Sequence, residues 1–227
     1  MKNITIVTGG TSGLGKALVK ELVSQGKDVC IIARQHQKIL NVLEEYGCNL
    51  IGYSGCLEDE YFVKKVFKEL KEKGYYINTL YNCAGVGIFG TPEDMDLNKI
   101  NQVMNSNVIG LMNITYETCK NMSTGGLIVN VMSTAGLKGN PNESLYCASK
   151  WAVRGFTEAM KAYYKKSNIK IVGVYPGGMN TPFWTPNCGL SPDVSKFMDP
   201  EEVAKAIVYN MQNWQTMHIA DLVIERR

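Results

Sequence analysis

The sequence has no long hydrophobic run, no basic run and almost no histidine. Its longest apolar stretches, such as VCIIA, are far shorter than the roughly 20 residues of a transmembrane helix. Lys and Arg never stand more than two together, and the formal net charge of +3 is small, which disfavours nucleic-acid binding. Met1 leads almost directly into the apolar segment ITIV, so we expect no targeting segment, no membrane contact and a cytoplasmic protein.

Patterns that bind metals are also missing. The two histidines, His36 and His218, are far apart in the chain, and the seven cysteines form no CxxC pair. We therefore predict no metal site and interpret the cysteines as reduced thiols. Cys83 and Cys147 lie close to motifs described below, but no histidine is placed in the sequence to activate them, so we interpret both as small packing residues.

What the sequence does contain is a regular alternation of apolar and amphipathic segments. Runs such as NITIVTG, DVCIIA and IKIVGVY predict buried strands, and GLGKALVKELVSQG predicts an amphipathic helix. This alternation is typical of βαβ units, in which helices cover both faces of a mostly parallel sheet. We predict one doubly wound α/β domain over residues 1–227 with seven strands, and a helical region over about 97–122 with a break near Ser106.

The segment TGGTSGLG joins the first predicted strand to the first predicted helix. Gly9, Gly13 and Gly15 permit a tight turn and a close backbone approach, and the helix that follows offers N–H groups to a phosphate. The spacing differs from the G-x-G-x-x-G pattern because the first interval is longer. We interpret this turn as a site for the pyrophosphate of a dinucleotide.

The second predicted strand ends at Ala33 and is followed by Arg34. Dinucleotide folds that select NAD usually carry an acidic residue about 20 residues beyond the glycines, where it binds the ribose 2′-hydroxyl. An arginine favours a 2′-phosphate instead, because its fork of N–H groups binds phosphate in two places and no carboxylate repels the charge. Arg34 therefore predicts NADP(H) rather than NAD(H).

Several motifs, taken in order, resemble those of the short-chain dehydrogenase/reductase family. TGGTSGLG at residues 8–15 matches the family's TGxxxGxG, and NCAG at residues 82–85 stands where the family has NNAG. Tyr146 and Lys150 match its YxxxK, and PGGMNT at residues 176–181 resembles its PGxxxT. The resemblance extends over essentially the whole chain. It implies a Rossmann fold and places the chain in a compact, NADP(H)-preferring branch of the family.

The resemblance also implies a catalytic set of four residues. Ser133 lies thirteen residues before Tyr146, at the separation found in the family, and Asn107 stands where the family has its asparagine. A free tyrosine has a pKa of about 10, and a nearby ammonium lowers that pKa toward the working range of a general acid/base. We expect Tyr146 to transfer the proton and Lys150 to lower its pKa and bind the nicotinamide ribose. Ser133 would bind the substrate oxygen, and Asn107 would hold a water that relays protons from Lys150.

Residues that would contact the cofactor follow from the same resemblance. They lie in the glycine turn, at the ends of the next strands, in the catalytic helix and in PGGMNT. They are Gly9, Thr11, Ser12, Gly13, Leu14, Gly15, Arg34, Leu57, Asn82, Ala84, Gly85, Tyr146, Lys150, Pro176, Gly177, Met179 and Thr181. One departure is Cys56 followed by Leu57, where the family usually has an acidic residue beside the adenine. We expect only backbone contacts to the adenine there.

We therefore predict an oxidoreductase that transfers a hydride between NADP(H) and a small carbonyl or secondary alcohol. A 3-oxoacyl-[acyl-carrier-protein] reductase and a pterin-type carbonyl reductase are alternatives within this chemistry. An NADPH-sensing protein without turnover is the alternative from another class. The loop at about 177–198 is predicted to cover the substrate, with Phe183 and Trp184 as an apolar wall or as packing residues. The resemblance further implies a homodimer or homotetramer that pairs through helices at about 107–121 and 144–166.

Overall fold

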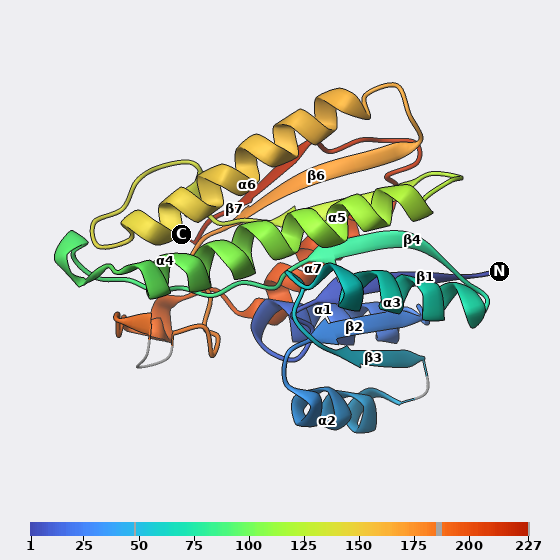
Figure 1. Ribbon diagram of the computed structural model, residues 1–227, viewed down its shortest axis with the longest axis horizontal. Helices are drawn as coiled ribbons and strands as arrows, with labels where there is room; N and C mark the ends of the chain where they lie inside the picture. The colour runs from blue at the N-terminus through green and yellow to red at the C-terminus, as the bar shows by residue number, and fades with distance from the viewer. Residues whose placement is uncertain (48, 185–187, 227) are drawn as a thin grey trace.

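The computed structural model describes residues 1–47, 49–184 and 188–226, and one parallel sheet lies at its centre (Figure 1). The described residues form seven strands in the order β3-β2-β1-β4-β5-β6-β7, and every neighbouring pair is parallel. The strands are β1 (Lys2–Thr8), β2 (Val29–Ala33), β3 (Leu50–Ser54), β4 (Tyr75–Asn82), β5 (Gly126–Val131), β6 (Ile169–Pro176) and β7 (Asp221–Ile224). The prediction of a doubly wound α/β domain with seven strands is confirmed. The predictions that concern Cys48 and residues 185–187 lie outside the described residues.

Two layers of helices cover the sheet, as the alternation of segments predicted. Apolar residues of α3, α5 and α6 pack on one face, and those of α1, α2 and α7 pack on the other (Figure 1). The helices are α1 (Gly13–Ser24), α2 (His36–Tyr46), α3 (Glu60–Glu72), α4 (Leu97–Met104), α5 (Gly110–Asn121), α6 (Ser144–Tyr163) and α7 (Pro200–Met211). In the described ranges, no helix is both long and apolar enough to cross a membrane.

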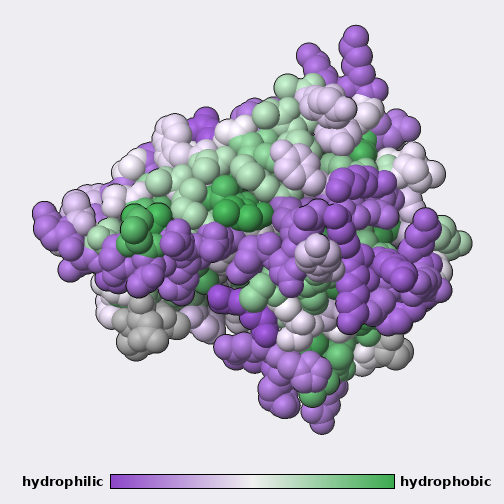
Figure 2. Space-filling view, in the orientation of Figure 1, coloured by the Kyte–Doolittle hydropathy of each residue, from purple (hydrophilic) through white to green (hydrophobic). Residues whose placement is uncertain are grey.

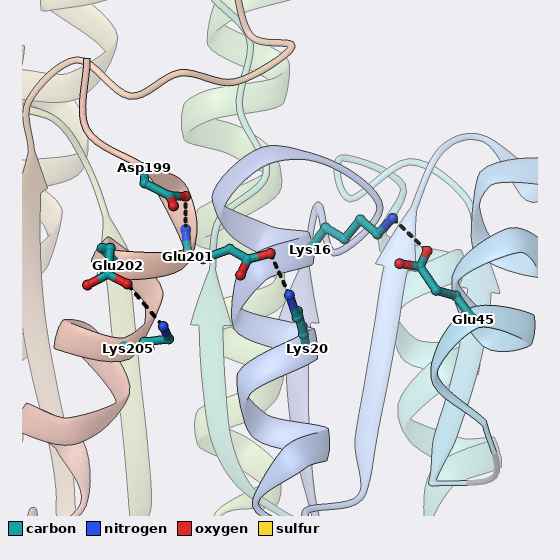
Figure 3. Close-up of polar contacts among 7 residues, drawn as sticks. All are labelled: Lys16, Lys20, Glu45, Asp199, Glu201, Glu202 and Lys205. Atoms are coloured by element: carbon teal, nitrogen blue, oxygen red, sulfur yellow. Dashed lines mark hydrogen bonds and ion pairs between the residues drawn. The ribbon is translucent and has the colours of Figure 1, made fainter. Parts of the chain in front are cut away.

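Salt bridges join the three helices of the second layer at their surface (Figure 3). Lys16 of α1 reaches Glu45 of α2 at 2.7 Å, and Lys20 of α1 reaches Glu201 of α7 at 2.6 Å. The Asp199 carboxylate accepts a hydrogen bond from the Glu201 N–H and so caps the start of α7. Exposed pairs of this kind stabilise a protein only slightly, so their main effect is to align α1 between its neighbours.

A π-helical turn, η2 (Asn105–Ile109), separates α4 from α5. The N–H of Gly110 bonds to the carbonyl oxygen of Asn105, so the turn holds one more residue than an α-helical turn. The irregularity lies at Ser106, where a break was expected, but the helix continues through it. It also turns Asn107 and Val108 into the protein interior, and the site depends on the first of these.

Strand order reverses between β1 and β4, the two strands at the middle of the sheet. Neighbouring connections leave in opposite directions here, which opens a crevice beyond the carboxyl ends of the strands. The loops after β1 and β4 are tied together at this point, because the Thr8 hydroxyl accepts the N–H groups of Cys83 at 3.0 Å and Ala84 at 3.1 Å. Parallel sheets of this kind bind their ligands in that crevice.

Candidate active site

A cavity of about 1320 Å³ runs along the carboxyl edge of the sheet. Its walls come from the loops that follow all seven strands, and they include every predicted site residue except Asn82 and Asn107. Segments as distant in the chain as the glycine turn, the catalytic helix and the PGGMNT segment therefore meet at one site. From the sequence, this convergence followed only from the rule that the carboxyl ends of parallel strands lie along the same edge of a sheet.

The glycine turn has no room for side chains. Gly9 has a φ of +67°, and a Cβ there would lie 2.9 Å from the Cα of Ala84. A Cβ on Gly15 would collide with the carbonyl oxygen of Gly9. The N-cap of α1, Ser12, makes no side-chain capping bond, and the first turn of α1 carries no acidic residue. The turn thus presents bare backbone and unpaired helix N–H groups, which fits the pyrophosphate of a nicotinamide dinucleotide.

Two cations lie where the second strand ends. Arg34 and Lys38 are both exposed and both line the cavity, with Lys38 in the first turn of α2. Sequence reasoning found Arg34 and missed Lys38. The signal was weak, because Arg34 precedes the N-cap of α2 and the helical spacing that relates residues four apart does not extend to it. Beside them, Leu57 lines the same end, and its carbonyl oxygen accepts a hydrogen bond from the Asn113 amide at 2.7 Å.

Tyr146, Lys150 and Ser133 come together at the middle of the cavity. Tyr146 is 9% and Lys150 6% exposed. The ammonium nitrogen of Lys150 lies 5.5 Å from the centre of the Tyr146 ring and 3.4 Å from the carbonyl oxygen of Val131. The Ser133 hydroxyl acts on Tyr146, whose pKa it lowers, and it accepts the N–H of Ala135 at 3.1 Å. A tyrosine, a serine and a lysine in contact form a group that can bind an oxygen and move a proton.

Asn107 lies behind this group rather than in the cavity. Its side-chain oxygen accepts the N–H of Val86 at 2.8 Å, and its amide nitrogen donates to the Val86 carbonyl at 2.9 Å and to the Ser149 hydroxyl at 3.1 Å. Ser149 in turn donates to the carbonyl oxygen of Tyr146 at 2.7 Å. These bonds use the Asn107 side chain to fix the loop after β4, and the expectation that Asn107 holds a water that relays protons from Lys150 stays a prediction. Asn107 and Ser149, which sequence reasoning missed, join the catalytic helix to the loop after β4.

Asn82 is likewise buried below the cavity and does not line it. Its amide nitrogen donates to Thr115 of α5 and to Asn130 of β5, both at 2.9 Å, and Asn130 donates to Thr157 of α6 at 2.9 Å. The prediction that Asn82 contacts the cofactor is not supported by this position. The hydrogen bonds of Asn82 and Asn130 instead hold β4, β5 and two helices together.

Burial controls the pKa values at the site. It lowers the pKa of Lys150 to about 8 and raises the pKa of Tyr146 well above its ordinary range. The hydrogen bond from Ser133 lowers the pKa of Tyr146, and the Glu143 carboxylate raises it, both by less than burial does. Burial is the largest of these effects, so the net pKa of Tyr146 lies above that of a free tyrosine. The expected lowering of this pKa by Lys150 stays a prediction.

The PGGMNT segment closes the cavity opposite the glycine turn. The Met179 carbonyl oxygen accepts the indole N–H of Trp184 at 3.0 Å. The N–H of Met179 is therefore the backbone group of this residue that could still bind a cofactor. The Thr181 hydroxyl accepts the N–H of Phe183 at 3.4 Å. A Cβ on Gly13 would lie 3.2 Å from the Cβ of Thr181, so this segment packs directly on the glycine turn.

Comparison with known proteins agrees with this geometry. A family model described as short chain dehydrogenase matches residues 3–188. The chain belongs to the short-chain dehydrogenase family. A short-chain dehydrogenase/reductase from Vibrio parahaemolyticus superposes with a TM-score of 0.87 and 32% identity, covering 98% of this chain and 96% of the other. ElxO, solved with NADP bound, has a TM-score of 0.86 and 28% identity, covering 99% of this chain and 97% of the other.

One curated relative shows the class of reaction. The 3-ketodihydrosphingosine reductase of Bos taurus is 30% identical over 220 residues, which cover 89% of this chain and 66% of the relative. This short-chain dehydrogenase therefore spans slightly less than two thirds of that protein's length. The printed name of the bovine protein describes a reductase, which agrees with the match to the short-chain dehydrogenase family.

Replacing Lys150 by Met should stabilise the protein at pH 7. Since the pKa of Lys150 falls from 10.5 to about 8 on folding, the folded protein bears the cost of a buried ammonium below pH 8. The free energy of unfolding therefore rises between pH 8 and 10.5, as the buried Lys150 loses its charge before an unfolded lysine does. Above about pH 10 the raised pKa of Tyr146 acts the other way and lowers the free energy of unfolding. Urea unfolding should show Lys150→Met more stable by up to about 3 kcal/mol at pH 7, and by much less at pH 9.5.

The matched control is Lys65→Met, on a lysine whose side chain is 73% exposed. Its unfolding free energy should change by less than about 0.5 kcal/mol at either pH. A Lys150→Met variant that is destabilised equally at both pH values would contradict the buried-charge account.

Proposed function

We propose that this short-chain dehydrogenase is an NADP(H)-dependent carbonyl reductase that also runs in reverse as an alcohol dehydrogenase. One observation carries the proposal: Tyr146, Ser133 and Lys150 meet in a cavity that continues to the glycine turn. A sensor without turnover would not need a buried proton donor at that point. The catalytic residues themselves, and the loop at about 177–198 as a substrate cover, belong to the same proposal.

The side chains would divide the work as follows. Bound nicotinamide supplies the hydride that reaches the carbonyl carbon. The Tyr146 hydroxyl donates its proton to the oxygen as the C=O bond becomes a single bond, and Ser133 hydrogen-bonds that oxygen and stabilises its charge. The Lys150 ammonium stabilises the phenolate that remains on Tyr146. Because burial raises the pKa of Tyr146, the side chain holds its proton at pH 7 and is ready to act as an acid.

Preference for NADP(H) rests on charge at the far end of the cavity. Arg34 and Lys38 line it together, and a 2′-phosphate would bind between two cations there. The relative solved with NADP bound supports the same preference. Glu58 also lines this end, so the two cations outnumber the one carboxylate beside them.

The alternative reactions stay open within this chemistry. The printed name of the bovine relative describes reduction of a ketone, which agrees with the reductase direction. An acyl-carrier reductase would need a basic surface at the mouth for an acidic carrier. The substrate end of the cavity instead carries one lysine, Lys138, and one glutamate, Glu143, so its charges balance.

We further propose a homodimer that pairs through α4, α5 and α6, or a homotetramer built from such dimers. Large hydrophobic side chains are exposed on these elements and on η2, among them Leu97, Ile109, Tyr116 and Trp151. Figure 2 shows hydrophobic residues gathered over this part of the molecule. A cytoplasmic location is part of the same proposal and is supported by the free thiols of the six described cysteines.

Replacing Tyr146 by Phe removes the proton donor and leaves the ring in place. We expect kcat for ketone reduction to fall by about a hundredfold to ten-thousandfold, while NADPH binding, followed by its fluorescence, stays within about twofold. The control is Tyr163→Phe on the same helix, where the side chain is 80% exposed. Turnover that survives in the Tyr146 variant would refute the proposed mechanism.

Replacing Arg34 or Lys38 by Ala should weaken NADPH and spare NADH. A hydrogen bond to a charged group contributes about 1.5–3 kcal/mol, so KM for NADPH should rise about ten- to hundredfold in each variant. Lys65→Ala, on an exposed helix outside the cavity, serves as the control. Equal losses with both cofactors would remove the case for a 2′-phosphate site.

Introducing charge on the proposed dimer surface should separate the subunits. Ile109→Glu or Trp151→Glu should shift sedimentation at micromolar concentration from dimer to monomer, because each buries an unpaired carboxylate in the interface. Leu40→Glu on α2, where the side chain is also partly exposed, should leave the assembly intact. A wild-type protein that sediments as a monomer would exclude the proposal.

A further inference from the structure

An aromatic wall stands directly against the proposed proton donor. It consists of Phe89, Phe183 and Trp184, from the loops after β4 and β6. The ring centre of Phe89 lies 5.3 Å from that of Tyr146, edge to face, and that of Phe183 lies 5.7 Å from it. Trp184 stacks on Phe89 at 5.6 Å and meets Phe183 at 5.2 Å. A substrate whose oxygen reaches Tyr146 must therefore lie beside these rings.

The wall is fixed in place and has no spare polar group. The indole N–H of Trp184, its single donor, is already bonded to Met179, and Phe89 is held by its backbone N–H, which donates to the Cys188 carbonyl at 2.7 Å. Phe89 is only 4% exposed and supports the other two rings from behind. Phe183 and Trp184 line the cavity with their rings edge to face, so the surface offered to a substrate there is apolar and aromatic.

Phe183 reaches across the cavity to its opposite side. A Cβ added to Gly87 would lie 2.5 Å from the tip of the Phe183 ring and 2.7 Å from that of Phe89. Gly87 lines the cavity too. The Phe183 ring thus fills the narrow space between Gly87 and Tyr146, and a substrate has to pack against the side of this ring that lines the cavity. A flat group makes closer contact with a ring than a branched or folded chain does.

Charges of both signs lie near Tyr146, so an anion finds no pocket lined by cations alone. Glu143 lines the cavity three residues before Tyr146, and the Asn140 amide holds its carboxylate at 2.9 Å. The Lys150 ammonium lies 5.5 Å from the centre of the Tyr146 ring, and Lys138 lies at the same end but is exposed to water. A carboxylate next to the reacting carbonyl would be attracted by Lys150 and repelled by Glu143, whereas an uncharged group loses nothing to Glu143.

We propose that the substrate is an uncharged ketone or aldehyde whose carbonyl is attached directly to a flat apolar ring, as in an aryl ketone. The ring stacks on Phe183 and Trp184 while the carbonyl oxygen meets Tyr146 and Ser133. This inference rests on the carbonyl reductase activity proposed above. It adds what that proposal lacks, which is a chemical class for the group beside the carbonyl.

The test compares three probes with the same purified enzyme and NADPH. Acetophenone carries the ring, 2-octanone has the same number of carbon atoms in a flexible chain, and benzoylformate adds a carboxylate to the aryl ketone. We expect kcat/KM for acetophenone to be at least about tenfold higher than kcat/KM for 2-octanone. It should be about a hundredfold higher than kcat/KM for benzoylformate. Tenfold corresponds to about 1.4 kcal/mol, the scale of one aromatic contact.

Phe183→Leu then removes the ring and keeps an apolar side chain. The preference for acetophenone over 2-octanone should fall at least about fivefold, mostly through KM. The control is Tyr209→Leu, an exposed aromatic on α7, in which the preference should not change.

The outcomes separate the two proposals. If the wild-type enzyme reduces 2-octanone or benzoylformate as well as acetophenone, the substrate class is wrong and the reductase proposal stands. An acetophenone preference that survives in Phe183→Leu also overturns the inference, because the wall would not be its cause. If no carbonyl compound is reduced under conditions in which NADPH binds, the proposed function itself fails.

Discussion

Two groups that prefer water, the Lys150 ammonium and the Tyr146 hydroxyl, are buried together at the carboxyl edge of the sheet, and the rest of the site depends on that burial. Their helix must be held against the sheet for this to persist. Ser149 and Asn107 do so from inside, by bonding the helix backbone to the loop after β4. Phe89 and Phe183 do so from outside, by packing on the tyrosine ring. Structural and chemical roles therefore overlap in the same few side chains.

Burial also sets the protonation state of the proposed proton donor. A tyrosine that keeps its proton is a suitable acid for reduction, and a lysine with a pKa near 8 can adjust its charge at little cost. The apolar wall contributes to both effects, because it removes water from the hydroxyl and narrows the space beside it. Substrate choice and proton affinity are thus consequences of the same packing.

Most of the fold was predictable because its signals are local. The alternation of apolar runs and amphipathic helices predicted the seven-stranded sheet, and the irregularity expected near Ser106 is a π-helical turn at Asn105–Ile109 within a continuous helix. The predicted residues of the glycine turn, Arg34 and the tyrosine–lysine pair all line one cavity. Three features could not be predicted from local patterns, for one reason. Whether Asn82 and Asn107 face the cavity, and which way the net pKa of Tyr146 moves, depends on neighbours distant in sequence.

The sequence by itself determined the order of the elements, the backbone freedom of the glycine turn and the spacing of the polar residues, since these follow from side-chain periodicity and the absence of a Cβ. Only the tertiary structure decided which of those polar side chains line the cavity. It also decided which of them are buried behind it and use their hydrogen bonds to hold the surrounding segments together. It also decided that Phe89 and Phe183, from loops almost a hundred residues apart, stand beside Tyr146. Hydrogen-bond saturation and burial are properties of the folded surroundings, and no local pattern records them.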